Sequence, residues 1–94
     1  MAKPIFSVDF NELLEPTLVL LSKEDTKVDS LGSEISLREG LEISVYDDDT
    51  NDQGKPDNLV ASGVVERNRT TGWGSHVKWC CRIDNMGIRP ESEI

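Results

Sequence analysis

The sequence has few residues that carry nucleophilic or metal-assisted chemistry. It holds two cysteines, Cys80 and Cys81, and one histidine, His76. On a regular strand His76 and Cys80 lie ~13 Å apart, whereas a thiolate–imidazole pair requires ~2.6–3.2 Å. A zinc site normally takes four ligands, which these three residues do not supply. We therefore expect no catalytic residue, no metal and no cofactor, and we interpret the protein as a non-enzyme.

Long apolar runs are also missing. A membrane-spanning helix needs ~20 consecutive apolar residues, but the longest such run here is Leu18 to Leu21. The apolar start of the chain is interrupted at Ser7 and Asp9, which does not match a secretory signal. The neighbouring cysteines point to opposite faces of a strand, which opposes a disulfide. These features favour a cytoplasmic protein with no membrane contact.

What the sequence does contain is short segments in which apolar and polar residues alternate. This alternation is typical of half-buried strands, and it predicts strands at 35–38, 41–46 and 76–84. A further strand is predicted at 59–65, which is rich in apolar residues. The segment 17–21 is apolar on both faces, so we predict that it is the most buried strand. We predict an all-β fold: one domain over residues 1–94 that forms a small antiparallel barrel or strongly curved sheet of five to six strands.

The connecting segments carry turn residues. We predict one short helical turn over Asp9–Glu15, stopped by Pro16, and a long mobile loop over 22–34. An acidic loop follows at 47–58, and a short exposed C-terminal tail occupies 89–94. Glycine inside the 59–65 strand indicates a bulge or a close approach of two backbones at Gly63.

The last predicted strand has a regular alternation that assigns its faces. Core positions are Val77, Trp79, Cys81 and Ile83. Surface positions are His76, Lys78, Cys80, Arg82 and Asp84. Cys80 is thus expected to be a surface or interface thiol.

Charge is strongly one-sided, with 18 acidic against 10 basic residues and a net charge of -8. Such a surface steers a positively charged partner toward the protein. We interpret the protein as a non-catalytic interaction module that docks a basic protein partner. The candidate partner-binding residues are Glu39, Glu42, Tyr46, Asp47, Asp48, Asp49 and Asp52. The Asp-rich loop does not match the helix–loop–helix calcium pattern, because Val60 stands where a bidentate Glu is needed, and weak calcium binding there stays open.

The alternative is a small barrel that binds single-stranded nucleic acid, which combines basic side chains with an aromatic stacking platform. Its candidate residues are Arg67, Arg69, Trp73, Lys78 and Arg82. We favour this alternative less, because a net charge of -8 repels a polyanion. The pattern also leaves open a monomer or a homodimer paired through a strand edge at Leu59–Val65.

Overall fold

The computed structural model of the chain describes residues 3–50 and 53–93. Within these ranges the structure is all-β, as predicted, apart from one 3-10 turn. The elements in chain order are β1 (Ile5–Ser7), β2 (Leu13–Glu15), β3 (Leu18–Ser22), β4 (Thr26–Val28), β5 (Glu34–Ser36), β6 (Glu42–Asp47), β7 (Leu59–Arg67), β8 (Trp79–Ile83), β9 (Arg89–Pro90) and η1 (Glu91–Glu93).

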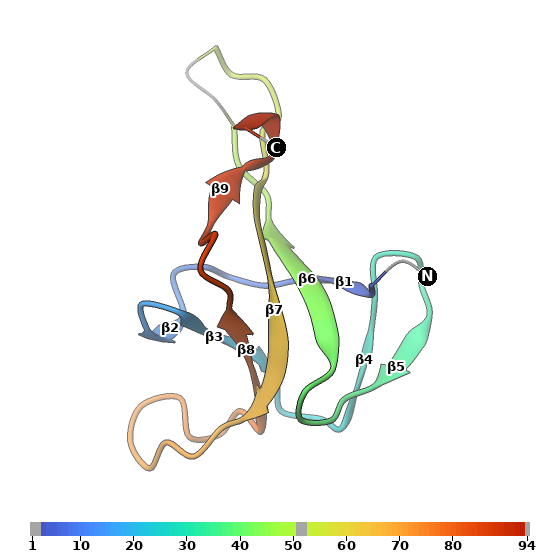
Figure 1. Ribbon diagram of the computed structural model, residues 1–94, viewed down its shortest axis with the longest axis vertical. Helices are drawn as coiled ribbons and strands as arrows, with labels where there is room; N and C mark the ends of the chain where they lie inside the picture. The colour runs from blue at the N-terminus through green and yellow to red at the C-terminus, as the bar shows by residue number, and fades with distance from the viewer. Residues whose placement is uncertain (1–2, 51–52, 94) are drawn as a thin grey trace.

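Seven strands form one mixed sheet, and β4 and β5 form a separate hairpin (Figure 1). The strand order is β1-β6-β7-β8-β3-β2, and β9 pairs with β7 beyond the end of β8. The prediction of an antiparallel sheet of five to six strands was incomplete, because β1 pairs with β6 in parallel. The end strands β1 and β2 do not pair with each other in the described part of the chain, so the sheet is not closed into a barrel.

The predicted helical turn over Asp9–Glu15 is wrong. The Asp9 side chain accepts a hydrogen bond from the backbone N–H of Asn11, and its carbonyl accepts one from Glu12. These bonds close a β-turn, and the chain continues as β2, which pairs with β3. Aspartate at this position favours a turn as readily as a helix start, and the available edge of β3 decides the outcome.

The predicted loop over 22–34 contains a strand that the sequence did not indicate. β4 pairs with β5 with Lys27 opposite Ile35. The connecting turn is closed by Asp29, whose side chain accepts hydrogen bonds from the backbone N–H groups of Leu31 and Ser33. This turn lies against β1, because the N–H of Ser30 donates to the carbonyl of Ile5 at 2.8 Å.

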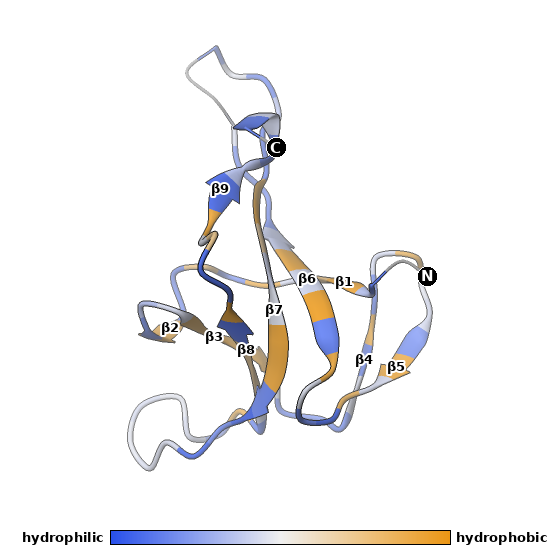
Figure 2. Ribbon diagram, in the orientation of Figure 1, coloured by the Kyte–Doolittle hydropathy of each residue, from blue (hydrophilic) through white to orange (hydrophobic). Residues whose placement is uncertain are grey.

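The main core lies on one face of the sheet, and its apolar residues recur along β6 and β7 (Figure 2). As predicted, β3 is buried on both faces. Val19 and Leu21 enter the main core, whereas Leu18 and Leu20 pack in a second cluster with Cys80.

Two residues of the last strand were assigned to the wrong face. Cys80 is fully buried in the second cluster, not exposed, and Val77 packs against that cluster instead of against the main core. The alternation breaks because β8 begins only at Trp79, and Val77 still belongs to the preceding loop, where its N–H donates to Gly74. That loop covers Cys80: Gly74 is buried and contacts the side chains of Leu14 and Leu20.

Two further expectations about edges and ends are corrected. The segment Leu59–Val65 is not an edge, because it lies within β7, which pairs with β6 on one side and with β8 and β9 on the other. The predicted tail 89–94 is only partly a tail, since β9 joins the sheet through Leu59 opposite Pro90 and Val60 opposite Arg89.

Candidate functional site

The predicted partner-binding residues do not form one patch. Glu42 begins β6 and Glu39 lies in the turn before it, whereas Asp47 ends the strand, and five residues of strand span ~16 Å. Glu39 accepts a hydrogen bond from Nη2 of Arg69 at 3.1 Å, which joins a residue of the acidic set to one of the basic set. Asp47 accepts a hydrogen bond from the backbone N–H of Phe10, so this carboxylate serves the fold.

The remaining acidic loop residues gather with the C-terminal turn at one end of the molecule (Figure 1). Asp57 accepts hydrogen bonds from both the N–H and the hydroxyl of Ser92, and the N–H of Glu91 donates to Asn58. These bonds bring η1 beside the loop. We call this the acidic end, which consists of Asp48, Asp49, Asp57, Glu91 and Glu93. The predicted residue Asp52 lies outside the described residues.

The acidic end has an excess of negative charge, because its five carboxylates lie in segments, 47–58 and 91–93, whose sequence holds one base, Lys55. The ion pairs among the described residues engage the carboxylates of Glu15, Asp25, Glu39 and Glu66, all away from this end. Sequence reasoning missed Glu91 and Glu93 as members, because their proximity to the loop depends on the pairing of β9 with β7.

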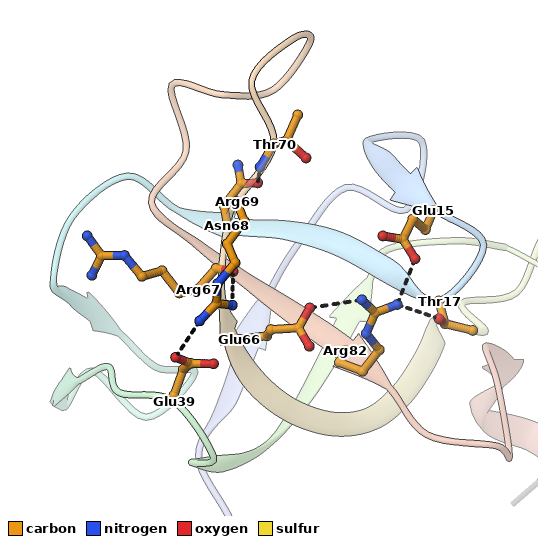
Figure 3. A network of polar contacts seen from close by, with 9 residues as sticks. All are labelled: Glu15, Thr17, Glu39, Glu66, Arg67, Asn68, Arg69, Thr70 and Arg82. Atoms are coloured by element: carbon orange, nitrogen blue, oxygen red, sulfur yellow. Dashed lines mark hydrogen bonds and ion pairs between the residues drawn. The ribbon is translucent and has the colours of Figure 1, made fainter.

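Arg82 of the alternative nucleic-acid set is held within the protein by two carboxylates (Figure 3). Nη2 donates to Glu66 at 2.9 Å, and Nη1 donates to both Glu15 and Thr17 at 3.0 Å. Hydrogen bonds to the two carboxylates raise the pKa of the Arg82 guanidinium. The network links β2, β7 and β8 across one face of the sheet.

The other members of the basic set also have intramolecular partners. Nζ of Lys78 lies 2.6 Å from Oδ1 of Asp25, and Nε1 of Trp79 donates to the same oxygen at 3.1 Å. These two hydrogen bonds, that from Lys78 first, lower the pKa of Asp25. Arg67 stacks over the Trp79 ring at 5.8 Å. With Arg69 bound to Glu39, each cation of the set has a carboxylate or an aromatic ring as a partner.

Trp73, the aromatic member of the alternative nucleic-acid set, is exposed, with 62% of its surface accessible. It lies in the loop that follows Asn68, whose amide nitrogen donates to the carbonyls of Gly74 and Val77 at 2.9 and 2.7 Å. The hydrogen bonds of Asn68 therefore fix the two ends of the loop, and Trp73 lies exposed between them.

The cysteines lie in surroundings that oppose thiolate formation. Burial, reinforced by the negative charge of Glu66, raises the pKa of Cys80 to about 11. Burial and the charge of Asp84 raise the pKa of Cys81 to about 12. Both thiols are free, and at neutral pH they are protonated and weakly nucleophilic.

A cleft of about 450 Å³ lies over the outer face of β1, β6 and β7. Its floor is made by side chains that face each other in the register: Ile5 opposite Ser44, Ser44 opposite Ser62, and Tyr46 opposite Val60. The segment from Asp84 to Glu91 forms the wall, which includes Met86 and Arg89. The two serines keep the floor low, because their side chains are small. Tyr46 is thus the one predicted partner-binding residue that lines this cleft.

Arg89 stands out among the cleft residues. Its Nε is buried and has no hydrogen-bond acceptor, and its guanidinium takes part in no ion pair within residues 3–50 and 53–93. Asp84 and Glu91 line the same cleft without bonding to it. A buried donor without an acceptor is rare in native proteins because it is costly, and this one lies at a cavity.

Exposed apolar side chains lie at the edge of the cleft, and we call them the apolar rim: Ile5, Leu31 and Met86. Ile5 and Met86 line the cleft directly. Leu31 is 88% exposed and follows Ser30, which is bonded to Ile5. The other exposed large apolar residues of the described chain are Val28 and Trp73. Such a concentration is typical of a contact surface.

No three His, Cys, Asp or Glu side chains come together as metal ligands among the residues that are described. In the same part of the chain, no helix is long and apolar enough to cross a membrane. Comparisons of the chain with protein-family models, curated proteins and solved structures found no match.

Proposed function

We propose that the protein is a non-catalytic interaction module that docks a basic protein partner through the acidic end. The observation that carries this proposal is the excess of carboxylates at that end: Asp48, Asp49, Asp57, Glu91 and Glu93 lie in two adjoining segments whose sequence holds one base, Lys55. A local negative field accelerates the encounter with a positively charged protein and selects against acidic ones. We place the interaction in the cytoplasm, where the free thiols of Cys80 and Cys81 stay reduced.

The surface beside the acidic end supports the same function. Glu91 belongs both to that end and to the wall of the cleft, so charge and apolar contact area adjoin. Charged groups supply mainly association rate and specificity, whereas buried apolar side chains supply most of the affinity at interfaces. The nucleic-acid alternative has less support, since Arg67, Arg69, Lys78 and Arg82 are engaged within the protein.

The test is affinity capture from a cell lysate on the immobilised protein at low and raised salt. The variant Asp48→Asn/Asp49→Asn/Glu93→Gln removes charge from the acidic end and leaves the cleft residue Glu91 in place. Its matched control, Glu12→Gln/Glu24→Gln/Glu34→Gln, removes the same charge from exposed positions elsewhere. We expect one basic protein to be recovered in a salt-sensitive manner, with an association rate lowered about tenfold by the first variant only.

Three other results would contradict this proposal. Equal losses in both variants would show that total charge matters and the acidic end does not. Recovery of nucleic acid that disappears in Trp73→Ala/Arg69→Ala would support the alternative instead. If neither protein nor nucleic acid is recovered at either salt concentration, both proposals are rejected.

A further inference from the structure

We infer that the cleft binds an extended basic segment of the partner, and that the Arg89 side chain turns into the cleft on binding, so that its Nε donates a hydrogen bond to a main-chain carbonyl of this segment. This inference rests on the proposed function and adds the site and the form of the bound segment. It goes beyond docking on the acidic end, because it assigns recognition to Arg89, Asp84 and the apolar rim.

Arg89 carries a hydrogen-bond donor that has no acceptor among the described residues. An arginine stays protonated in proteins, so its Nε–H is a permanent donor. Burial removes this donor from water, and the described residues give it no acceptor. When the long Arg89 side chain turns into the cleft, a bound chain supplies an acceptor, because each residue of an extended segment carries a carbonyl oxygen. Ser44 and Ser62 add two hydroxyl groups on the floor that can pair with the same backbone.

The cleft has negative charge on one side and apolar surface on the other. Asp84 and Glu91 place two carboxylates in a cleft that has one guanidinium, and the acidic end continues from Glu91. On the other side the cleft opens beside Ile5 and the exposed Leu31. A segment that carries both basic and apolar side chains meets both regions, whereas an acidic one is repelled.

The floor of the cleft is narrow. It spans β1, β6 and β7, which are neighbours in the sheet, so it is ~10 Å across. A helix with its side chains is ~10–12 Å wide and does not fit beside the wall. An extended segment is narrower, and it presents successive side chains to opposite sides. Its apolar side chains then contact Tyr46, Val60 and Met86, while the basic ones reach the carboxylates.

The test uses three synthetic peptides and the amide ¹H–¹⁵N spectrum of the full chain. The probe is acetyl-Lys-Leu-Lys-Leu-Lys-amide; one control replaces each Lys by Glu, and the other replaces each Leu by Ser. We expect the probe to shift the amide resonances of Tyr46, Ser62 and residues 86–89. The two control peptides should leave these resonances unchanged.

The variant Arg89→Lys separates the Nε–H from the charge, because it keeps the cation and removes that donor. We expect it to weaken binding of the probe about fivefold. Arg38→Lys, at an exposed position, is the matched control and leaves affinity unchanged. Urea unfolding of both variants shows whether Arg89→Lys still folds; if it does not, Met86→Ser replaces it, with the same expected loss of affinity.

Shifts confined to Asp48, Asp49 and Asp57 would overturn the inference about the cleft while the proposed function stands. Equal binding of the charge-inverted peptide, or full affinity in a folded Arg89→Lys, would also overturn it. Failure of the proposed function itself is seen separately, as an empty lysate capture.

Discussion

The backbone of Gly63 lies so close to the backbone carbonyl of Arg82 that a Cβ atom at Gly63 would overlap the carbonyl oxygen. The contact is made where β7 pairs with β8, with Gly63 opposite Ile83. Glycine is therefore required here by space. Gly63→Ala must push two central strands apart, and we expect it to lower the free energy of unfolding by at least ~3 kcal/mol.

The matched control is Gly72→Ala, because a Cβ at Gly72 has no atom within 4 Å. We expect this change to stay within ~0.5 kcal/mol of the parent. Urea unfolding followed by tryptophan fluorescence measures both. Equal stability of the two variants would contradict the assigned contact.

The ion pairs of Arg82 and Arg69 differ in exposure, so they should differ in strength. Arg82 and Glu66 have side chains 33% and 31% exposed, against 67% and 51% for Arg69 and Glu39. Exposed pairs contribute ~0–1 kcal/mol because water screens them. In double-mutant cycles with Ala we expect a coupling of about 1 kcal/mol for Arg82–Glu66 and below ~0.5 kcal/mol for Arg69–Glu39. The reverse order would contradict the stronger of the two ion pairs drawn in Figure 3, that of Arg82 with Glu66.

Asp25 makes the free energy of unfolding depend on pH in the acidic range. Its pKa is lowered in the folded protein by hydrogen bonds from Lys78 and Trp79, so the unfolded chain binds the proton at a higher pH than the folded one. This stabilisation is complete well above the ordinary pKa of 3.8 and is lost as the pH falls through the lowered folded value. Asp25→Asn should be less stable than the parent at pH 7, and the gap should narrow below pH 3.8. Urea midpoints from pH 7 to pH 2 measure it, and a gap that does not change with pH would contradict this account.

The buried thiols should resist alkylation. With pKa values of about 11 and 12, Cys80 and Cys81 are protonated at pH 8, and the fold covers both side chains. We expect iodoacetamide to leave the folded protein unlabelled and to modify both residues in urea, as followed by intact mass. Labelling of Cys80 under native conditions would show that the 68–78 loop opens readily.

Most strands of the sheet could be predicted from the pattern of apolar residues in the sequence. Ile43 and Val45 lie in the main core as their alternation predicts, and Gly63 makes the close approach that was one of the two alternatives for it. The pattern failed where long-range packing decides the face. Val77 has the apolar character of a core strand residue, but a loop anchored by Asn68 carries it to the opposite side of the sheet.

The cleft was not predictable, because no short segment contains it. Its floor comes from β1, β6 and β7, and its wall comes from the segment that leads to β9. In the sequence, Arg89 is a basic residue of the predicted exposed tail, and nothing distinguishes it. Its significance depends on the lack of an acceptor near Nε, which is a property of the folded structure.

The pairings at the two ends of the sheet also bear on how fast the protein folds. β6 and β7 are neighbours in the chain and can pair early, whereas β1 must meet β6 with Ile5 opposite Ser44, and β3 must meet β8 with Val19 opposite Cys81. Contacts between such distant parts of the chain slow folding, because the intervening loops have to close first. The floor of the cleft includes Ile5 of β1. Binding should therefore recover only after β1 has paired with β6, later than the pairing of β6 with β7.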